Sequence, residues 1–319
     1  MDENMGYEQE YTHGYTKEQL LEIKGDMPIP GYEEFWQKQY GRATSCKLDY
    51  TVEGKDWAPN PGTTIYQVSF IACDGFKIGM WICRPDVSLG GQIIAHGYGN
   101  PAVPDVGRSP GLTIAMPCVP GLGLSQCEEI PWQGRYHAAY GFEDPEKYVL
   151  ISGVRNLWTA VSIMIDMFPD VKDNIVCSGG SLGGAMGAIC TAWDPRIKAT
   201  ELNVPTLGGR ITLNYPGTEG DPSHTRVTLA QASEQGMRTF DLCSASAAAR
   251  FIRVPTLVTP ALSDGNVPPP GQFAVANSIP EEYRILRIRE VGHHAPTDAD
   301  KLMEQNELEP IRKKIFHLA

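Results

Sequence analysis

Residues 174–185 read Asn-Ile-Val-Cys-Ser-Gly-Gly-Ser-Leu-Gly-Gly-Ala, and this stretch decides how the rest of the chain is interpreted. It holds the motif Gly-x-Ser-x-Gly, from Gly179 to Gly183, directly after a short apolar run and directly before a helix-like segment. A serine on such a turn is typical of a nucleophile elbow, in which the hydroxyl projects above a sheet. A Gly-rich turn with a capping serine would share the pentapeptide. We interpret Ser181 as a nucleophile because the strand and helix signals are both in place.

Short apolar runs alternate with longer helical segments on both sides of this turn. The runs are Gln92–Ala95, Leu112–Met116, Ile175–Ser178, Ala199–Asn203, Thr256–Pro260 and Arg284–Arg289. Runs of this kind are expected in a parallel sheet covered by helices on both faces. The clearest helix is Lys147–Phe168, in which apolar residues recur every three or four positions, and a second starts at Ser181 and ends near Trp193. The alternation predicts an α/β fold with a mostly parallel central sheet.

Three further regions depart from the alternation. Residues 1–60 form a polar, aromatic N-terminal extension with a helix expected at Pro30–Tyr40. Next, Thr64–Cys73 and Phe76–Cys83 flank Asp-Gly, which predicts a β-hairpin before the sheet. Residues 205–239 are polar and Gly-rich, and we interpret them as a small lid-like insertion. Because no linker is visible, residues 1–319 are predicted to form one domain.

A serine nucleophile needs a base, and in this architecture the base comes last along the chain. The histidines after the nucleophile are His224, His293, His294 and His317. His293 follows the run Arg284–Arg289 by a short loop that ends in glycine, so we predict it as the base, with the adjacent His294 as the alternative. His224 lies in the lid-like insertion and His317 near the end of the chain.

The base needs an acid to orient it, and that acid should follow the preceding strand. Asp264 comes shortly after Thr256–Pro260 and fits this position. Asp241 is the rival, but its sequence context is interpreted as a helix cap. We therefore predict Asp264 as the acid.

An oxyanion hole needs two backbone N–H donors. One is the residue after the nucleophile, Leu182. The other is expected in the Gly-rich loop that follows Gln92–Ala95, where Tyr98 is the candidate. His96 in the same loop is interpreted as a structural hydrogen-bonding residue and not as a base.

Composition excludes several classes of protein. With 42% hydrophobic and 20% charged residues, the chain is globular and not disordered. No apolar run reaches the length of a membrane span. The formal net charge of -11 argues against binding to nucleic acid or to an anionic membrane. Small-molecule or oligosaccharide esters are the partners expected.

The sequence predicts neither a metal nor a cofactor. None of the eight cysteines forms a CxxC pair, no His/Glu set has metal-ligand spacing, and Gly121-Leu-Gly123 lacks the third glycine of a dinucleotide fingerprint. The cysteines are interpreted as reduced structural thiols, although their even number also permits disulfides. The start of the chain, Met1–Asn4, lacks the features of a signal peptide, so the chain as given is expected to be cytoplasmic, or secreted or periplasmic if a leader was removed.

These motifs together resemble the acetyl xylan esterase and cephalosporin C deacetylase family, carbohydrate esterase family 7 of the α/β-hydrolases. The matching positions are His96-Gly97-Tyr98, Tyr148 to Arg155, Gly179-Gly180-Ser181, Phe240-Asp241, Asp264 with Pro268-Pro269, and Gly292-His293. The resemblance implies an α/β-hydrolase fold and a Ser181–Asp264–His293 triad. It also implies that Tyr98 and Leu182 supply the oxyanion N–H groups.

The chain departs from the family at three places. The family's Arg-Gly-Gln motif is replaced by residues 119–123, Val-Pro-Gly-Leu-Gly. Leu182 stands where the family has glutamine, and His294 where it has glutamate. The oxyanion donor at Leu182 is a backbone N–H, so the change from glutamine to leucine does not remove it. The departures leave the substrate and the family's hexameric ring open, so a homo-oligomer is an expectation from the resemblance alone.

We predict a serine carboxylic-ester hydrolase that deacetylates a carbohydrate or a similar small alcohol through an acyl-enzyme. A peptidase or lactone hydrolase of the same fold and a catalytically idle binding protein are the alternatives. Acetyl esters should be preferred over longer acyl chains. Trp132, Tyr136 and Tyr140 are candidates to close the acyl pocket, with core packing as the equal alternative.

Overall fold

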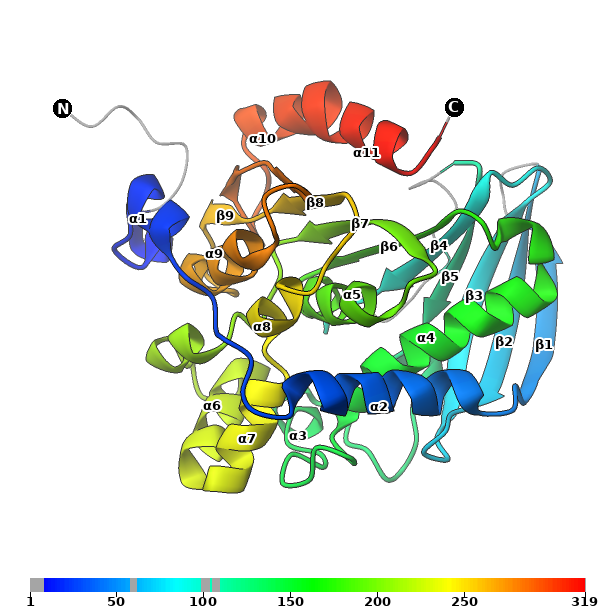
Figure 1. Cartoon of the computed structure of the whole chain (residues 1–319), viewed down its shortest axis with the longest axis horizontal. Coiled ribbons are helices and arrows are strands. Elements are labelled where there is room, and N and C mark those ends of the chain that lie inside the picture. Colours follow the sequence, from blue (N-terminus) through cyan, green and yellow to red (C-terminus); the bar gives the residue numbers. More distant parts are fainter. Residues whose placement is uncertain (1–8, 58–61, 99–103, 105–109, 319) are drawn as a thin grey trace.

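The computed structural model describes residues 9–57, 62–98, 104 and 110–318, and its centre is a nine-stranded sheet (Figure 1). The start of the chain, Met1–Asn4, lies outside the described residues. The strands are β1 (Tyr50–Trp57), β2 (Thr63–Ile71), β3 (Lys77–Pro85), β4 (Gly90–Ala95), β5 (Leu112–Pro117), β6 (Ile175–Gly180), β7 (Ile197–Asn203), β8 (Thr256–Thr259) and β10 (Arg284–Leu286). Their order is β1-β2-β3-β5-β4-β6-β7-β8-β10. Along this order, adjacent strands pair antiparallel from β1 through β2 and β3 to β5. From β5 onward, through β4, β6, β7 and β8 to β10, adjacent strands pair parallel.

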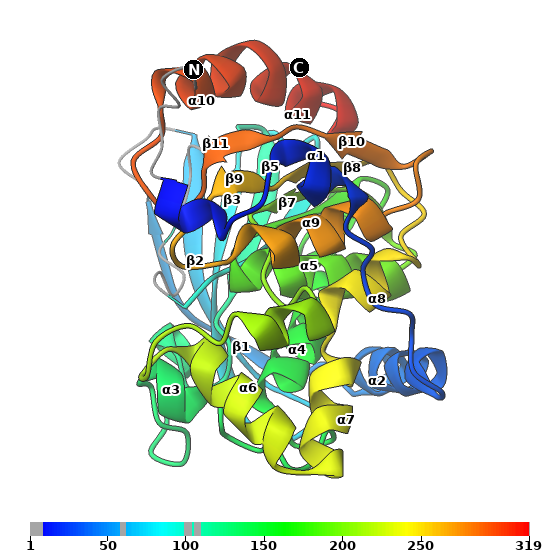
Figure 2. The same cartoon turned by 90° about the vertical axis from the view of Figure 1, so that its left-hand side faces the viewer.

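Helices cover both faces of this sheet, as predicted (Figures 1 and 2). They are α1 (Lys17–Glu22), α2 (Tyr32–Ser45), α3 (Gly134–His137), α4 (Val149–Met167), α5 (Leu182–Trp193), α6 (Pro222–Ala232), α7 (Glu234–Leu242), α8 (Ala245–Ala249), α9 (Pro269–Ser278), α10 (Asp298–Met303) and α11 (Glu309–Ile315). Figure 1 shows α2, α4, α5 and α8 below the sheet and α10 and α11 above it.

The two faces of the sheet bury two separate hydrophobic cores. Successive residues of a strand point to opposite faces. On β4, Ile93 accordingly packs into the larger core with α4 and α5, whereas Ile94 packs into the smaller core with Leu308 and Phe316. A strand buried on both faces has to be apolar throughout. This is why the central strands were recognisable as continuous apolar runs.

Two details of the sheet differ from the prediction. The hairpin expected from the Asp-Gly signal is part of a three-stranded antiparallel unit, because β1 pairs with β2 as an additional edge strand. The run Arg284–Arg289 is not one strand: β10 pairs with β8, and β11 (Arg289–Val291) pairs with β9 (Ala261–Ser263) in a separate two-stranded sheet. Pro260 separates β8 from β9, and a proline has no N–H to continue a ladder.

Helix α4 is the one described helix that is long and apolar enough to cross a membrane. In the fold it is a core helix, with 83% of its apolar window buried inside the protein. It also carries Arg155, which is fully buried and forms an ion pair of 2.6 Å with Asp74 at the β2–β3 turn. These contacts fix α4 against the antiparallel strands.

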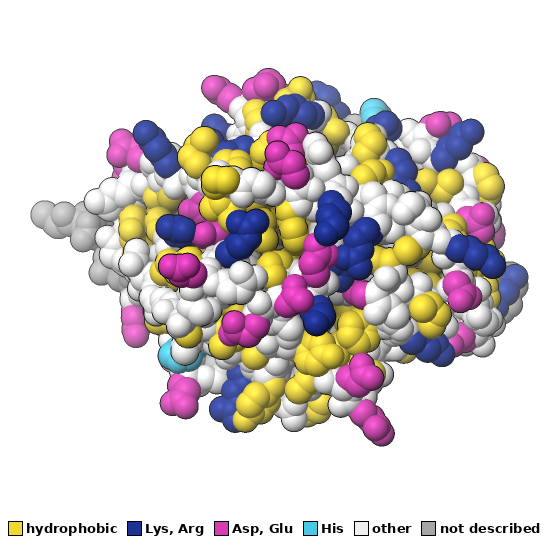
Figure 3. Space-filling model, turned by 60° about the horizontal axis from the view of Figure 1, so that its bottom comes forward, with side chains coloured by type: hydrophobic (Ala, Val, Ile, Leu, Met, Phe, Trp, Pro, Cys, Tyr) yellow, Lys and Arg dark blue, Asp and Glu magenta, His cyan; other side chains and the backbone are white. Residues whose placement is uncertain are grey.

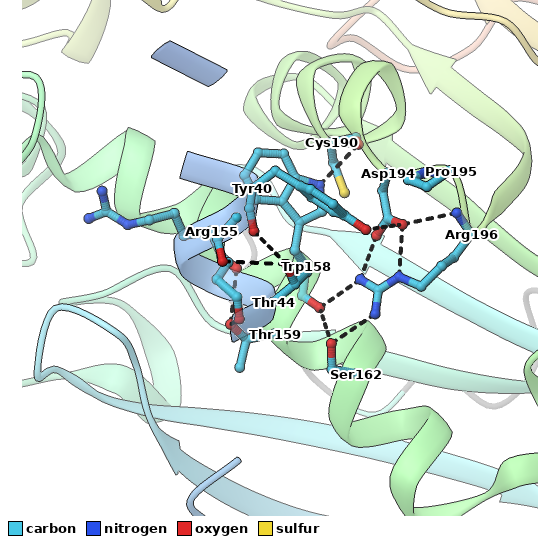
Figure 4. Close-up of polar contacts among 12 residues, drawn as sticks. Tyr40, Thr44, Arg155, Trp158, Thr159, Ser162, Cys190, Asp194, Pro195 and Arg196 are labelled. Carbon is cyan, nitrogen blue, oxygen red and sulfur yellow. Dashed lines mark hydrogen bonds and ion pairs between the residues drawn. The ribbon is translucent and has the colours of Figure 1, made fainter. Parts of the chain in front are cut away.

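A buried polar cluster joins α2, α4 and α5 (Figure 4). The Trp158 indole N–H donates to the carbonyl of Cys190 at 3.0 Å, which links α4 to α5. Arg196 donates to the Trp158 carbonyl at 3.1 Å and to the Asp194 carboxylate at 2.8 Å. The Tyr40 hydroxyl of α2 also reaches Asp194. The cluster anchors the C-terminal end of α5, the helix whose N-terminal end follows Ser181.

The segment 205–239 folds as short helices beside the carboxyl ends of the parallel strands. It holds a 3₁₀ turn at Arg210–Asn214, then α6, and most of α7 (Figure 2). Gly134 of α3 lies against Pro222 at the start of α6. On the face of the molecule drawn in Figure 3, acidic and basic side chains are interspersed with apolar ones and do not gather by sign.

Candidate active site

Ser181 occupies the sharp turn between β6 and α5. Its backbone has φ 57° and ψ −123°, a left-handed conformation that is unusual for a residue with a side chain. The turn is held by hydrogen bonds to the chain after β7: the Ser181 N–H donates to the Asn203 carbonyl at 3.0 Å, and the Thr206 N–H donates to the Ser181 carbonyl at 3.1 Å. The conformation is the one that the sequence motif predicts for a nucleophile elbow.

Glycines around the turn are required by close backbone approach. A Cβ at Gly179 would overlap the Gly183 carbonyl, and a Cβ at Gly183 would overlap the Ala95 carbonyl. Gly97 lies directly beside the serine, since a Cβ there would be 3.5 Å from the Ser181 Cβ. The loop after β4 therefore borders the serine.

Asp264 and His293 meet at the ends of β9 and β11. The His293 Nδ1–H donates to Asp264 Oδ2 at 2.7 Å, although 29 positions separate the two residues in the sequence. The carboxylate is fully buried, and its Oδ1 accepts the backbone N–H groups of Asn266 at 2.9 Å and Val267 at 3.0 Å. These donors fix the carboxylate so that its second oxygen faces the imidazole.

Gln272 on α9 is a site residue that the sequence analysis missed. Its amide donates to Asp264 Oδ2 at 2.9 Å and to the Val267 carbonyl at 2.6 Å, and its side-chain oxygen accepts the Ala261 N–H at 2.8 Å. The side chain is fully buried. Its position eight residues after Asp264, on the helix of the same strand–helix unit, was the available signal.

The rejected alternatives lie elsewhere. His294 stacks on Tyr11, with ring centroids 5.0 Å apart, and has no bond to Asp264. Asp241 is not a helix cap, which corrects the sequence interpretation: it lies in the last turn of α7 and accepts two bonds from Arg210, at 2.9 and 2.7 Å. The helix that follows, α8, is capped instead by Ser244, whose side chain accepts the Ala247 N–H.

Two buried histidines hold the loop that carries Tyr98. The His96 ring bridges the loops after β4 and β5: its Nδ1–H donates to the Gly97 carbonyl at 2.8 Å and its Nε2 accepts the Val119 N–H at 2.9 Å. This confirms the structural reading of His96. His137 Nε2–H donates to the Pro120 carbonyl at 2.8 Å, and its Nδ1 accepts the Tyr98 hydroxyl at 3.1 Å.

Burial lowers the pKa of both imidazoles, that of His137 to about 4. Both rings therefore remain neutral near neutral pH. A neutral ring with one donor and one acceptor nitrogen is what each of these bonding patterns requires.

A cavity of about 460 Å³ opens above the serine. It is lined by Gly97, Tyr98, Leu150, Ser181, Leu182, Thr206, Leu207, Asp221, Pro222, Ser223, Arg226, Gly265, Asn266, Val267 and His293. The predicted serine, base and oxyanion residues thus face one cavity, and Asp264 lies behind the base. Leu182 is the first residue of α5, where a helix leaves its N–H groups unpaired.

The prediction for the acyl pocket was wrong. Trp132, Tyr136 and Tyr140 do not line this cavity, and Trp132 and Tyr136 are 62% and 50% exposed. The cavity is closed instead by α4 and by the segment 205–239, through Leu150, Leu207 and residues of α6. The three aromatic residues were chosen because they follow the second sheet strand closely in the sequence. Closeness in the sequence does not show which segment lines the cavity at the serine.

Within the described part of the chain, no group of three or more His, Cys, Asp or Glu side chains could hold a metal ion. Five of the cysteines are buried, and burial raises the pKa of the Cys118, Cys190 and Cys243 thiols. Buried protonated thiols pack as small apolar groups.

A mostly parallel sheet with a serine at the strand–helix turn defines the class: the protein is an α/β-hydrolase. Residues 134–304, more than half of the chain, match the sequence profile of the acetyl xylan esterase (AXE1) family. The chain belongs to this family of ester hydrolases, which confirms the resemblance.

Particular relatives agree with this assignment. An acetyl esterase, Axe7A, of Xylanibacter ruminicola is 27% identical over 182 residues, which is 54% of this chain and 40% of that protein. The match thus spans well under two thirds of the relative's length. Acetyl xylan esterases of a Thermoanaerobacterium and a Paenibacillus species share the fold, with TM-scores of 0.77 and 0.75 at 16% and 19% identity. Each comparison covers at least 93% of this chain and 99% of the other.

Proposed function

We propose that this protein hydrolyses acetyl esters of a carbohydrate or a similar small alcohol, with Ser181 as nucleophile. The observation that carries the proposal is the 2.7 Å bond between the His293 imidazole and the buried Asp264, at a cavity that Ser181 also lines. A histidine oriented by a buried carboxylate is the device that activates a serine. Membership of the acetyl xylan esterase family supports the choice of ester and of acyl group.

The reaction would proceed through an acyl-enzyme. His293 Nε2 takes the Ser181 proton as the serine oxygen attacks the ester carbonyl, and Asp264 stabilises the imidazolium that forms. The N–H groups of Tyr98 and Leu182 receive the oxyanion of the tetrahedral intermediate. His293 then returns the proton to the leaving alcohol. Water, activated by the same imidazole, releases acetate and restores the serine.

The experiment is a hydrolysis assay on acetylated xylose and glucose and on 4-nitrophenyl esters. The acyl chain of the 4-nitrophenyl esters is varied from acetyl to octanoyl. Ser181→Ala and His293→Ala should lower kcat by roughly four to six orders of magnitude, and the double variant should be little worse than either. Ser45→Ala, an exposed serine at the end of α2, is the matched control.

His294→Ala tests the alternative base, and it should retain activity. A chelator should leave the rate unchanged. Full activity of Ser181→Ala, or loss of activity in His294→Ala with retention in His293→Ala, would refute the assignment. Failure of the pure wild type to cleave any of these esters would favour a binding protein with an idle site.

A further inference from the structure

Arg226 is a buried cation at the wall of the cavity, and the proposed chemistry does not use it. It lies on α6 (Figure 2), in the helical segment 205–239, and lines the same cavity as Ser181. It is 5% exposed, and among the described residues that line the cavity it is the lone Lys or Arg. Arginine is rarely buried to this degree without a partner.

The described residues provide no counter-ion for this guanidinium. Its Nε is buried without a hydrogen-bond partner, and the polar side chain that acts on the guanidinium most directly is the neutral hydroxyl of Tyr148. The Arg226 charge acts on the Tyr98 and Tyr148 hydroxyls and on the Cys243 thiol, where it opposes the rise in pKa that burial causes. All three groups are neutral at neutral pH, so none of them compensates a positive charge.

The carboxylates in the neighbourhood already have partners. Asp221, the acidic residue that lines the cavity, is exposed and accepts the N–H and the hydroxyl of Thr218, both at 3.0 Å. Asp241 accepts both of its bonds from Arg210. Among the described residues, neither carboxylate forms an ion pair with Arg226.

An unpaired buried arginine is costly to the fold. A lysine could release its proton, but a guanidinium remains charged at any physiological pH. Phe240 covers one face of the group, with the guanidinium carbon 5.1 Å from the ring centroid. That contact provides a weak cation–π attraction, and the Nε–H edge of the guanidinium is left without a carboxylate partner. Such an edge matches a planar carboxylate.

We propose that Arg226 binds a carboxylate of the substrate, so that the preferred esters are those of an anionic molecule. This rests on the proposed esterase function and adds a specificity residue to it. The carboxylate could belong to the alcohol, as in an acetylated sugar acid, which keeps the acetyl group of the proposed function. It could instead belong to the acyl group, as in a hemiester of a dicarboxylic acid, which would keep the esterase chemistry but replace the acetyl group. Both present the same group to the guanidinium.

Two pairs of substrates separate charge from shape. The first pair is mono-O-acetyl-glucuronic acid and mono-O-acetyl-glucuronamide, and the second is the hemisuccinyl ester of methyl glucoside and its terminal amide. In each pair a carboxylate is replaced by a neutral amide of nearly the same shape, which presents one acceptor oxygen in place of two. In one of the pairs, wild type should favour the carboxylate by roughly 10- to 100-fold in kcat/KM, the range for a hydrogen bond between charged groups. The pair that responds shows which side of the ester carries the carboxylate.

Variants then assign the preference to Arg226. Arg226→Gln should abolish the ratio between carboxylate and amide, and Arg226→Lys should keep part of it, because a lysine retains the charge but not the planar fork. Arg238→Gln is the matched control: Arg238 is exposed on α7 and does not line the cavity, so the same change in net charge should leave the ratio as in wild type.

The outcomes distinguish this inference from the proposed function. If wild type cleaves 4-nitrophenyl acetate and the amides but does not favour either carboxylate, Arg226 has no such role and the esterase assignment still holds. That comparison decides the matter even if Arg226→Gln fails to fold. A preference that persists in Arg226→Gln would also overturn the inference. If wild type cleaves no ester, the proposed function itself fails.

Discussion

Acidification should destabilise this protein through one buried imidazole, that of His137. Burial holds its pKa at about 4 in the fold, against 6.5 for an ordinary histidine. Below pH 6.5 the unfolded chain takes up a proton that the folded protein refuses, so the free energy of unfolding falls as the pH drops towards 4. Above pH 6.5 the ring is neutral in both states and contributes no pH dependence.

The size of the effect follows from the two pKa values. Their difference of about 2.5 corresponds to about 3 kcal/mol, which is reached near pH 4, and about 2 kcal/mol of it should be lost by pH 5. His96 acts in the same direction, because burial lowers its pKa as well. The carboxylates whose pKa is lowered, such as Glu146 and Glu304, affect stability mostly below about pH 5.

The assay is urea unfolding followed by circular dichroism at several pH values between about 7.5 and 5, on wild type and on His137→Gln. The contributions of the other titrating groups cancel in the difference between the two free energies of unfolding. As the pH falls over this range, the excess stability of wild type over His137→Gln should shrink by about 2 kcal/mol. The exposed His317→Gln is the control, because it removes an imidazole without touching the interior. Parallel curves for wild type and His137→Gln would refute the reasoning, as would an NMR titration of the His137 ring centred near 6.5.

Three further changes test the packing of the site. Gln272→Ala removes an N–H donor from buried Asp264 and should lower kcat by about 10-fold or more with little change in KM, so an unchanged kcat would contradict its positioning role. Gly183→Ala should destabilise the fold by about 2 kcal/mol or more in urea unfolding, since its Cβ would overlap the Ala95 carbonyl. Gly41→Ala on exposed α2 has open space around its Cβ and should raise the free energy of unfolding by about 0.5 to 1 kcal/mol, with a decrease counting against this account.

Features that depend on local geometry were predictable from the sequence. Ser181 was identified because a tight turn demands glycine at fixed neighbouring positions, whatever the rest of the chain does. The central strands and α4 were found because burial on both faces, or along one helical face, imposes an apolar period that can be read directly. Asp264 and His293 followed from chain order, since in this topology each partner comes after a later strand.

Features that depend on how distant segments come together needed the tertiary structure. The strands β9 and β11 are only three residues long, so they show no period, and their pairing follows from the break at Pro260. Gln272 looks like any polar residue on a helix until α9 turns it towards Asp264. The same holds for Arg226: in sequence it is a charge in a polar segment, and only the packing of α6 against the rest of the domain removes it from water. Burial and proximity are properties of the packed chain, and a pattern of neighbouring residues does not contain them.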